Sequence, residues 1–362
     1  MYATQPLQPL LSREFNVSIV HASFFTAVIM MFLAIAPIMY GYLLEHVNAK
    51  RVLIIASIIL FITNIILSFS TTYSLFLIAR IIEASVIPAI LTACMSILAS
   101  DKINIKKNMS IYVAATVFGG LVGRVLSGFI ATEFGWRMVF VSLSFALLLG
   151  LYLIKQLSFD TQAKMNKPKL FDIITILKDR RFAVVYTLMF TVFFVFAGIL
   201  NVLPFRIKEQ IPDITETQIG LLYLGYGVGI IVSLFIHKIV ALFKKELRAI
   251  IFGIITLIIS IFLFLSKTPL VIFAVVFLLC LGMFIVHTVS TRIANSLQES
   301  QKALTSGMYL TFYYLGGAVG SILPAMVYAT FGWGVTIGVF VLALCIILGV
   351  VFFNRKLFKA YN

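Results

Sequence analysis

Three charged residues lie deep inside strongly apolar stretches of the sequence, namely Arg80, Glu83 and Arg124. A charge at the centre of a bilayer costs roughly 2.5–3.5 kcal/mol on insertion scales, so residues that accept this cost usually have a role. Arg80 and Glu83 are three residues apart and therefore share one face of a helix. At a rise of about 1.5 Å per residue, Arg124 on the next apolar stretch reaches a similar depth. We predict that the three side chains form one cluster.

Glu83 is the only carboxylate deep within these stretches, which makes it the candidate for proton binding. Burial favours the protonated form of a carboxylate, whereas a nearby arginine favours the ionised form. A carboxylate that alternates between these two settings can carry a proton, with Arg80 and Arg124 modulating it. Two alternatives stay open, namely a permanent structural ion pair and an anionic ligand held between the two arginines.

His287 is the only histidine well inside the second half of the chain. Histidine can relay protons, and the alternative interpretation is a polar side chain that fills a gap between helices. Tyr223, Tyr226 and Tyr313 lie in apolar stretches of the same half. Their rings are candidates to line a cavity for an apolar or cationic solute, and packing in the core or against lipid is the alternative.

The composition excludes a water-soluble enzyme and a disordered chain. Of the 362 residues, 62% are hydrophobic and 11% are charged, and the mean hydropathy is +1.11. Soluble domains have about 45–50% apolar and about 25% charged residues. The apolar surface of this chain is therefore too large for a compact fold in water to bury.

The sequence also carries no pattern typical of an enzyme or of a cofactor site. Cys94, Cys280 and Cys345 have neither a paired nor a zinc-binding spacing. Phosphate-binding loops and the motifs of hydrolases and metalloproteases are missing from the sequence. We therefore predict a protein that is not an enzyme and needs no cofactor, and whose work draws on an ion gradient.

Eleven stretches are long and apolar enough to cross a bilayer as helices, which needs roughly 20 residues each. They lack the strict alternation of barrel strands, so the predicted fold is all-α and polytopic. The stretches are 18–44, 52–70, 73–99, 110–132, 136–155, 182–205, 218–243, 248–266, 269–291, 305–329 and 334–353.

The positive charges predict the orientation of these helices. If the C-terminus is cytoplasmic, 21 of the 28 Lys and Arg residues fall on the inside, five fall outside, and two lie within the membrane. Cytoplasmic loops carry the excess of Lys and Arg, so this orientation is favoured. It also accounts for the net charge of +15 without a nucleic-acid partner.

The longest charged loop, residues 156–181, divides the predicted helices into two groups. We predict an N-terminal bundle over 1–155, a cytoplasmic linker over 156–181 and a C-terminal six-helix bundle over 182–362. The end of the linker is either a short amphipathic helix or a solvated connection.

The two halves resemble each other at a constant offset of 197 residues, which is typical of transporter folds. Within each half, two glycines are four residues apart, and small residues at that spacing let helices pack closely. The two tryptophans suit an aromatic belt at a membrane surface. The matching positions are Gly119, Gly123, Phe134, Gly135 and Trp136 in the first half, and Gly316, Gly320, Phe331, Gly332 and Trp333 in the second.

The same offset places the counterpart of the helix near Phe182 about 15 residues before Met1. We therefore expect Met1 to about Leu10 to be the tail of a twelfth helix. A misassigned start codon is the first explanation, and a genuine eleven-helix protein or a degraded gene is the alternative.

Several motifs resemble those of the major facilitator superfamily. The loop with Gly41, Glu45, Lys50 and Arg51 resembles the superfamily motif G-x-L-x-D-R-x-G-R-K, with Glu45 in place of Asp. The resemblance implies that this loop is a gating element.

Motifs of proton-coupled exporters recur around the charged residues. Arg80-x-x-Glu83-Ala84 resembles R-x-x-Q-G. The stretch around Gly119 and Gly123 resembles G-x-x-x-G-P-x-x-G, with Arg124 in place of Pro. Similarity to the arabinose-efflux-type (YnfM-like) branch rests on Gly123-Arg124, Trp136-Arg137, Gly282-x-Phe284-x-x-His287 and Tyr309 to Gly316.

The resemblance implies two six-helix bundles and a secondary active transporter of the plasma (inner) membrane. Such a protein would export a small molecule, such as a drug, sugar or metabolite, in exchange for protons by alternating access. The first helices of the two halves face the central cavity in this fold, so Gln5 and Asn201 become candidate substrate contacts. We expect a monomer in the lipid bilayer.

Two other functions stay open at this stage. One is proton-coupled uptake of an organic anion. The other is a non-transporting membrane protein or truncated remnant, motivated by the absent first helix.

Overall fold

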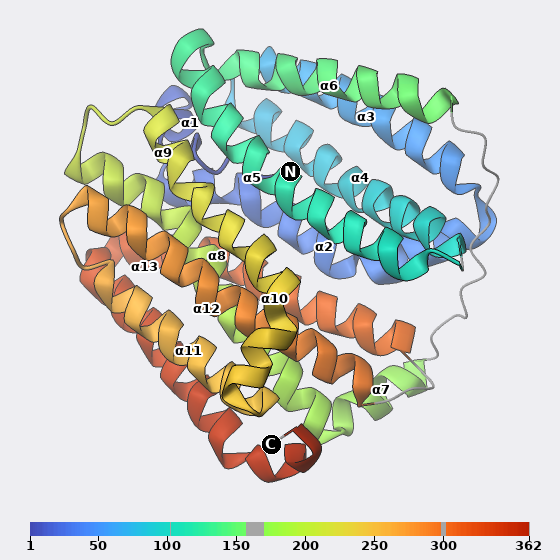
Figure 1. The fold of residues 1–362 in the computed structure, drawn as a ribbon. Coiled ribbons are helices and arrows are strands. Elements are labelled where there is room, and N and C mark those ends of the chain that lie inside the picture. The colour runs from blue at the N-terminus through green and yellow to red at the C-terminus, as the bar shows by residue number, and fades with distance from the viewer. Residues whose placement is uncertain (102, 157–169, 298–301, 362) are drawn as a thin grey trace. The chain divides into compact units, whose positions relative to one another are not determined.

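The chain is helical wherever it has regular structure among the described residues, as the all-α prediction requires (Figure 1). The structure, a computed structural model, describes residues 1–101, 103–156, 170–297 and 302–361. Within these ranges, ten stretches are long and apolar enough to cross a membrane. The prediction of a polytopic membrane protein is confirmed.

The chain forms two compact units. Unit 1 consists of Met1–Lys167 and Ile214–Leu221, and unit 2 consists of Pro168–Asp213 and Leu222–Asn362. Unit 1 therefore contains most of the first half of the chain together with a short segment of the second half, Ile214–Leu221.

Unit 1 is built around α4, which packs against α2, α3 and α5, while α3 also packs along α6 (Figure 1). Side-chain caps begin two of these helices: the side chain of Asn48 accepts from the first turn of α3, and that of Thr72 accepts from the first turn of α4. The helices are α1 (Gln8–Glu14), α2 (Ile19–His46), α3 (Ala49–Ser68), α4 (Tyr73–Ser100), α5 (Ile105–Phe134) and α6 (Trp136–Gln156).

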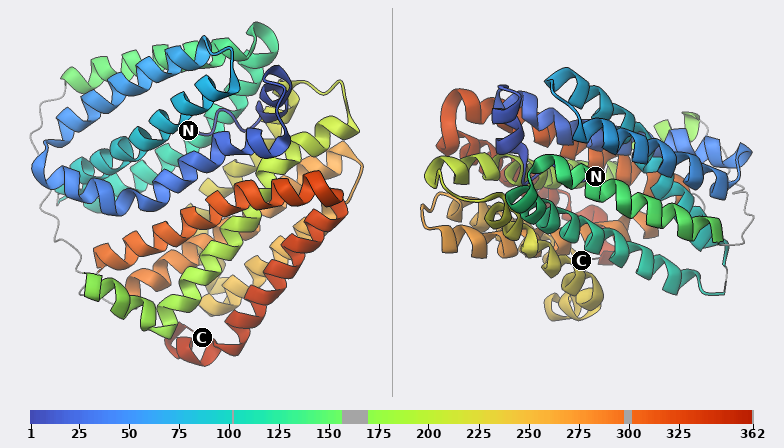
Figure 2. Two further views of the ribbon diagram at one scale, coloured as in Figure 1. Left: turned by 180° about the vertical axis from the view of Figure 1, so that it is seen from behind. Right: turned by 90° about the horizontal axis from the view of Figure 1, so that it is seen from above.

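In unit 2, α8 packs along α13, and α12 packs against α8, α10, α11 and α13 (Figure 2). The elements are α7 (Leu170–Lys178), α8 (Arg180–Gln210), the 3-10 helix η1 (Tyr223–Tyr226), α10 (Gly227–Phe243), α11 (Glu246–Leu263), α12 (Pro269–Ser296), α13 (Lys302–Phe353) and the 3-10 helix η2 (Arg355–Tyr361). Helix α9 (Glu216–Leu222) precedes η1 and lies almost wholly in the segment grouped with unit 1.

Helix α13 contains two of the predicted spans. It has 52 residues, and its backbone leaves the helical region at Gly332, where φ is 78°. Gly135, which separates α5 from α6, has a φ of 85°. Glycine adopts this left-handed region without a steric penalty. The same break therefore occurs at matching positions of the two halves.

The helices themselves follow the predicted repeat. Helices α2 to α6 begin at 19, 49, 73, 105 and 136, and their counterparts begin or resume at 216, 246, 269, 302 and 333. Every pair is separated by 196 or 197 residues. The internal repeat thus extends from short motifs to all five pairs of helices.

The N-terminal segment differs from the prediction. Residues Ala3–Leu7 form turns, and not the tail of a helix, with hydrogen bonds from the N–H groups of Gln5 and Leu7 to the carbonyls of Tyr2 and Thr4. Pro9 lies in the first turn of α1, where its missing N–H has no partner within the helix.

Three further details refine the predictions. The predicted span 218–243 is interrupted by η1. Both tryptophans are buried, Trp136 at 4% and Trp333 at 7% exposure, so the aromatic-belt interpretation was wrong for them. Residues 170–178 at the end of the linker are helical as α7, whereas residues 157–169 of the linker lie outside the described residues.

Candidate functional site

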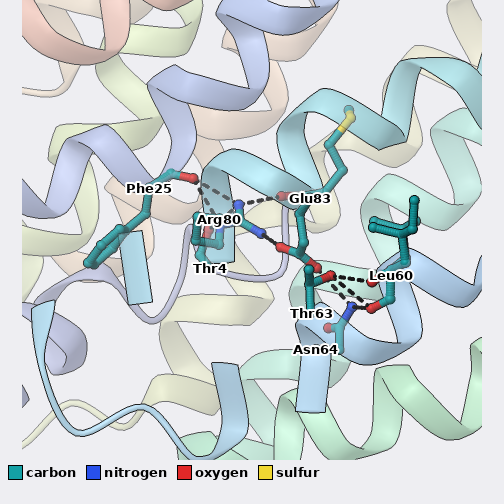
Figure 3. A network of polar contacts seen from close by, with 9 residues as sticks. Thr4, Phe25, Leu60, Thr63, Asn64, Arg80 and Glu83 are labelled. Atoms are coloured by element: carbon teal, nitrogen blue, oxygen red, sulfur yellow. Dashed lines mark hydrogen bonds and ion pairs between the residues drawn. The ribbon is translucent and has the colours of Figure 1, made fainter. Parts of the chain in front are cut away.

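Arg80 and Glu83 form a buried ion pair on one face of α4 (Figure 3). The Arg80 Nη1 atom donates to Glu83 Oε2 at 2.6 Å. The two side chains are only 3% and 6% exposed. A buried pair is weakly screened by salt, so each charge depends on its partner.

Arg80 also connects α4 to α2 and to the N-terminal segment (Figure 3). Its Nε and Nη2 atoms donate to the carbonyl of Phe25 at 3.2 and 2.8 Å. Nη2 also lies 3.3 Å from the hydroxyl of Thr4 and 3.2 Å from the carbonyl of Met1. The donors of this buried guanidinium group are therefore well supplied with acceptors.

Asn64 binds the other oxygen of Glu83 and was missed in the sequence. Its Nδ2 atom, reaching from α3, donates to Glu83 Oε1 at 2.8 Å and to the carbonyl of Leu60 at 2.7 Å. Both oxygens of the carboxylate are therefore hydrogen-bonded. The available signal was a single amide in the middle of the apolar stretch 52–70, which indicated a polar contact but not its partner.

Arg124 is completely buried on α5 and binds the same N-terminal segment. Its Nε atom donates to Gln5 Oε1 at 2.6 Å, and its Nη1 atom donates to the carbonyl of Gly120 at 2.7 Å. The guanidinium carbon lies 4.0 Å from the centre of the Tyr2 ring. A Cβ at Gly120 would lie 3.2 Å from Nη1, so the absence of a side chain there leaves room for the arginine.

The three charged residues thus gather around the segment Met1–Gln5. Met1 and Thr4 bind Arg80, while Tyr2 and Gln5 bind Arg124. Arg80 and Glu83 contact each other directly, whereas Arg124 is linked to them through this segment, in which Gln5 serves it as a hydrogen-bond acceptor. A function of these residues in proton coupling stays a prediction.

His287 lies in unit 2 beside two tyrosines of α13. Its Nδ1 atom is 3.0 Å from the hydroxyl of Tyr309, which also donates to the His287 carbonyl at 3.1 Å. The ring of Tyr313 has its centre 4.9 Å from that of His287, and it stacks on Phe193 of α8 at 3.8 Å. The histidine therefore joins α12 to α13 through neutral partners.

The remaining candidate substrate contacts of unit 2 fall into two groups. Tyr223 is 2% exposed and donates to the carbonyl of Leu200, and Asn201 is fully buried on α8. Tyr226 is half-buried, and its ring packs against Phe196 at 5.5 Å and Phe284 at 6.0 Å. Tyr223 therefore supports the packing of η1 on α8, while Tyr226 and Tyr313 are the more accessible tyrosines.

The two glycine pairs of the repeat behave differently. A Cβ added at Gly316 or Gly320 would overlap the carbonyl oxygen of Phe190 or Phe194 on α8. A Cβ added at Gly119 or Gly123 would meet no atom within 4 Å. The close packing expected at both pairs is present at Gly316 and Gly320, and the described residues do not show it at the other pair.

The predicted gating loop is mostly helix. Gly41 and Glu45 lie within α2, the side chain of Glu45 is outside the described part of the structure, and only residues 47 and 48 separate α2 from α3. Lys50 and Arg51 lie in the first turn of α3 and donate their backbone N–H groups to Asn48 Oδ1. The Lys50 ammonium donates to the carbonyl of Lys155 at the end of α6, at 3.3 Å.

Comparison with a family model settles the family. The model described as Major Facilitator Superfamily matches residues 1–297 and 210–361. The chain belongs to the Major Facilitator Superfamily. It is therefore a membrane-embedded transporter of small molecules and not an enzyme, as predicted.

Two curated members of the superfamily cover almost the whole chain. The uncharacterized MFS-type transporter YybF of Bacillus subtilis (strain 168) is 22% identical over 356 residues, which are 96% of this chain and 88% of YybF. The inner membrane transport protein YnfM of Escherichia coli (strain K12) is 24% identical over 355 residues, covering 96% of this chain and 84% of YnfM. The second similarity is consistent with the predicted YnfM-like branch.

Solved structures of the superfamily share the fold. A bacterial homolog of the human lysosomal transporter Spinster, in an inward-facing and occupied conformation, has a TM-score of 0.76 at 13% identity, covering 98% of this chain and 93% of the homolog. The nucleoside transporter NupG has a TM-score of 0.78 at 13% identity, covering 96% and 94%.

Proposed function

We propose that this superfamily member is a proton-coupled secondary transporter that exports a small molecule by alternating access. Glu83 is the group that binds and releases the proton, and Arg80 and Arg124 modulate it. His287 is a secondary candidate for proton transfer. The observation that carries the proposal is the burial of a single carboxylate between Arg80 and Asn64 inside an apolar bundle.

Protonation of Glu83 changes the charge balance of the cluster. With Glu83 ionised, Arg80, Glu83 and Arg124 carry a net charge of one positive unit. Once Glu83 is protonated, Arg80 loses its carboxylate partner, and an uncompensated buried charge is strongly unfavourable. The protonated cluster therefore favours a rearrangement of α4 and α5, which is the coupling that an exchanger needs.

We place the protein in the plasma (inner) membrane as a monomer, with its C-terminus in the cytoplasm. The charge pattern supports this orientation, which puts 21 Lys and Arg residues inside. The YnfM relative is itself named an inner membrane protein. The Lys50–Lys155 contact, which joins the ends of α3 and α6, supports a gating role for Gly41, Glu45, Lys50 and Arg51.

Transport into inverted membrane vesicles with an acidic interior tests the function. The probes are ethidium, L-arabinose and uridine, which represent a drug, a sugar and a metabolite. We expect a flux that depends on the pH gradient, and a loss of that dependence in Glu83→Gln. Glu133→Gln is the matched control, because Glu133 is exposed at the end of α5.

Two outcomes of this assay contradict the proposal. A Glu83→Gln protein that still follows the pH gradient would show that Glu83 is a structural ion pair. A wild-type protein that moves none of the probes, with or without the gradient, would favour a non-transporting protein.

Uptake of an organic anion together with protons is the second candidate. It is supported by the excess of two arginines over one carboxylate in the buried cluster. Protonation of Glu83 would remove the negative charge that partly balances the two arginines. An anion could then replace that charge, so proton and anion would bind together. Benzoate uptake that is stimulated by an acidic exterior and lost in Arg124→Gln would favour this function over export.

A further inference from the structure

We propose that Asn64 is the positioning residue that sets the proton affinity of Glu83. This inference rests on the proposed role of Glu83 as the proton-binding group. It assigns to α3 a function that none of the sequence motifs indicated.

The first observation is the division of the Glu83 carboxylate between two donors of different chemistry (Figure 3). Arg80 donates to Oε2, and Asn64 donates to Oε1. Arginine stays protonated and can only donate, whereas an amide carries both donors and an acceptor. Asn64 is thus the contact that is able to serve both the ionised and the protonated carboxyl group.

The second observation is the state of the Asn64 acceptor. Asn64 is 3% exposed, and its Oδ1 atom is buried without a hydrogen-bond partner in the described structure. An unsatisfied buried acceptor is unfavourable and calls for an explanation. A proton on Glu83 Oε1 supplies the missing donor if the Asn64 amide turns Oδ1 toward it.

The rotation would change the hydrogen bonds of Asn64 within α3. The amide would give up its bond to the carbonyl of Leu60, and that carbonyl keeps the hydroxyl of Thr63 as a donor at 3.1 Å. Thr63 itself bonds to the carbonyl oxygens of its own helix, at Ile59 and Leu60. In the described structure these bonds of its hydroxyl stay within α3, so Thr63 provides a control on the same helix.

The charged and titratable groups around Glu83 come from three elements. They are Arg80 on its own helix, Arg124 on α5, and the Met1 amino group with Tyr2 in the N-terminal segment. On α3, the contact with Glu83 is the neutral amide of Asn64. Replacing Asn64 therefore changes the hydrogen bonding of Glu83 without changing any charge in its surroundings.

The sign of the effect follows from bond strengths. A hydrogen bond to an ionised carboxylate is about twice as strong as one to the neutral acid. Losing Asn64 therefore destabilises the ionised form more than the protonated form, and the midpoint of Glu83 protonation should rise by about one pH unit.

Infrared titration of the purified full-length protein in lipid tests this inference. The carboxylic-acid band of Glu83 is assigned by its loss in Glu83→Gln, and its midpoint is compared among variants. We expect a higher midpoint in Asn64→Leu and an unchanged midpoint in Thr63→Val. Asn64→Gln keeps an amide, so its midpoint should lie between those of Asn64→Leu and the wild type.

The outcomes separate this inference from the proposed function. If Asn64→Leu fails to fold, Asn64→Thr replaces it, because its hydroxyl would bond within α3 as that of Thr63 does. A Glu83 band with the wild-type midpoint in these variants overturns the role of Asn64 and leaves the proposed function standing. A Glu83 that stays ionised at every pH in the wild type and in every variant overturns both.

Discussion

Matching positions of the two repeats carry opposite kinds of residues. Arg80 and Glu83 on α4 correspond, 197 residues later, to Phe277 and Cys280 on α12. Arg124 on α5 corresponds to Ser321 on α13. The second half folds the same helices in the same order with neutral residues at all of these places, so the fold itself does not require the charges.

The aromatic residues are divided in the reverse sense. His287 and Tyr313 on the second half correspond to Ile90 and Thr116 on the first. Contacts between rings join α8, α12 and α13 of unit 2, whereas ionic and amide contacts join α2, α3 and α4 of unit 1. This difference teaches that the first repeat is specialised for charge and the second for apolar and aromatic contact.

Removal of one member of the charged pair gives the largest expected loss of stability, and exchange of both members for their neutral counterparts should reverse it. Arg80→Leu alone leaves Glu83 buried without its cation and should destabilise the protein by about 3–5 kcal/mol. The double variant Arg80→Phe with Glu83→Cys introduces the residues of the second repeat and should recover most of this loss, because apolar replacements of a buried pair are often neutral. Thermal unfolding in detergent measures both. A double variant as unstable as Arg80→Leu would contradict the comparison.

The glycine pairs give the next largest effect. Gly316→Ala forces a methyl group against the backbone of α8, and overpacking of this kind costs about 1–3 kcal/mol. Gly119→Ala meets open space and gains the better helix propensity of alanine, so it should be neutral or stabilising by up to about 1 kcal/mol. The two thermal-unfolding curves should move in different directions, and equal losses would refute the packing difference.

Two matching tyrosines test the comparison at the level of one hydrogen bond. Tyr112 donates to the carbonyl of Leu91, and Tyr309 contacts both the carbonyl and the Nδ1 atom of His287. Tyr112→Phe should cost about 1 kcal/mol, and Tyr309→Phe should cost more because it also leaves the imidazole without its partner. Equal losses of thermal stability would show that His287 adds nothing to the tyrosine contact.

The helix caps should give the smallest effect. Hydrogen bonds from Arg181 hold the pKa of Asp179, the cap of α8, below its ordinary value of 3.8. The stabilisation is therefore present above that value and is lost as the pH falls through the lower pKa of the folded state. Because Asp179 is partly exposed, we expect about 0.5–1 kcal/mol.

The cap of α3 in unit 1, Asn48, is an amide that does not change its charge with pH. The variant Asp179→Asn gives α8 the same kind of cap and is the comparison for the wild type. Thermal stability compared between neutral and strongly acidic pH should fall less in Asp179→Asn than in the wild type. The same acid sensitivity in both proteins would assign it to other groups.

The positions of the helices were largely predictable, because the length of each apolar stretch in the sequence corresponds to the length of a helix. The predicted span 136–155 agrees with Trp136–Gln156, and 52–70 agrees closely with Ala49–Ser68. Hydropathy is insensitive to local backbone changes, so the 3-10 turn at Tyr223–Tyr226 and the turns of Ala3–Leu7 were not predicted.

The site was predictable only where its residues are close in the sequence. The pairing of Arg80 with Glu83 follows from their spacing on one helix. Asn64 meets Glu83 across 19 residues, and Gln5 meets Arg124 across 119. Such contacts depend on how each helix is rotated about its axis and which neighbour it packs against, and apolarity on all sides of a helix leaves both undetermined.

The central claim is that Glu83 changes its protonation state, and infrared titration of wild type against Glu83→Gln tests it most directly. We predict a carboxylic-acid band that grows as the pH falls and that is missing in the variant. A difference spectrum without such a band at any pH at which the protein stays folded would show that Glu83 stays ionised beside Arg80. The cluster would then be a structural ion pair, and the specialisation of the first repeat for proton coupling would be wrong.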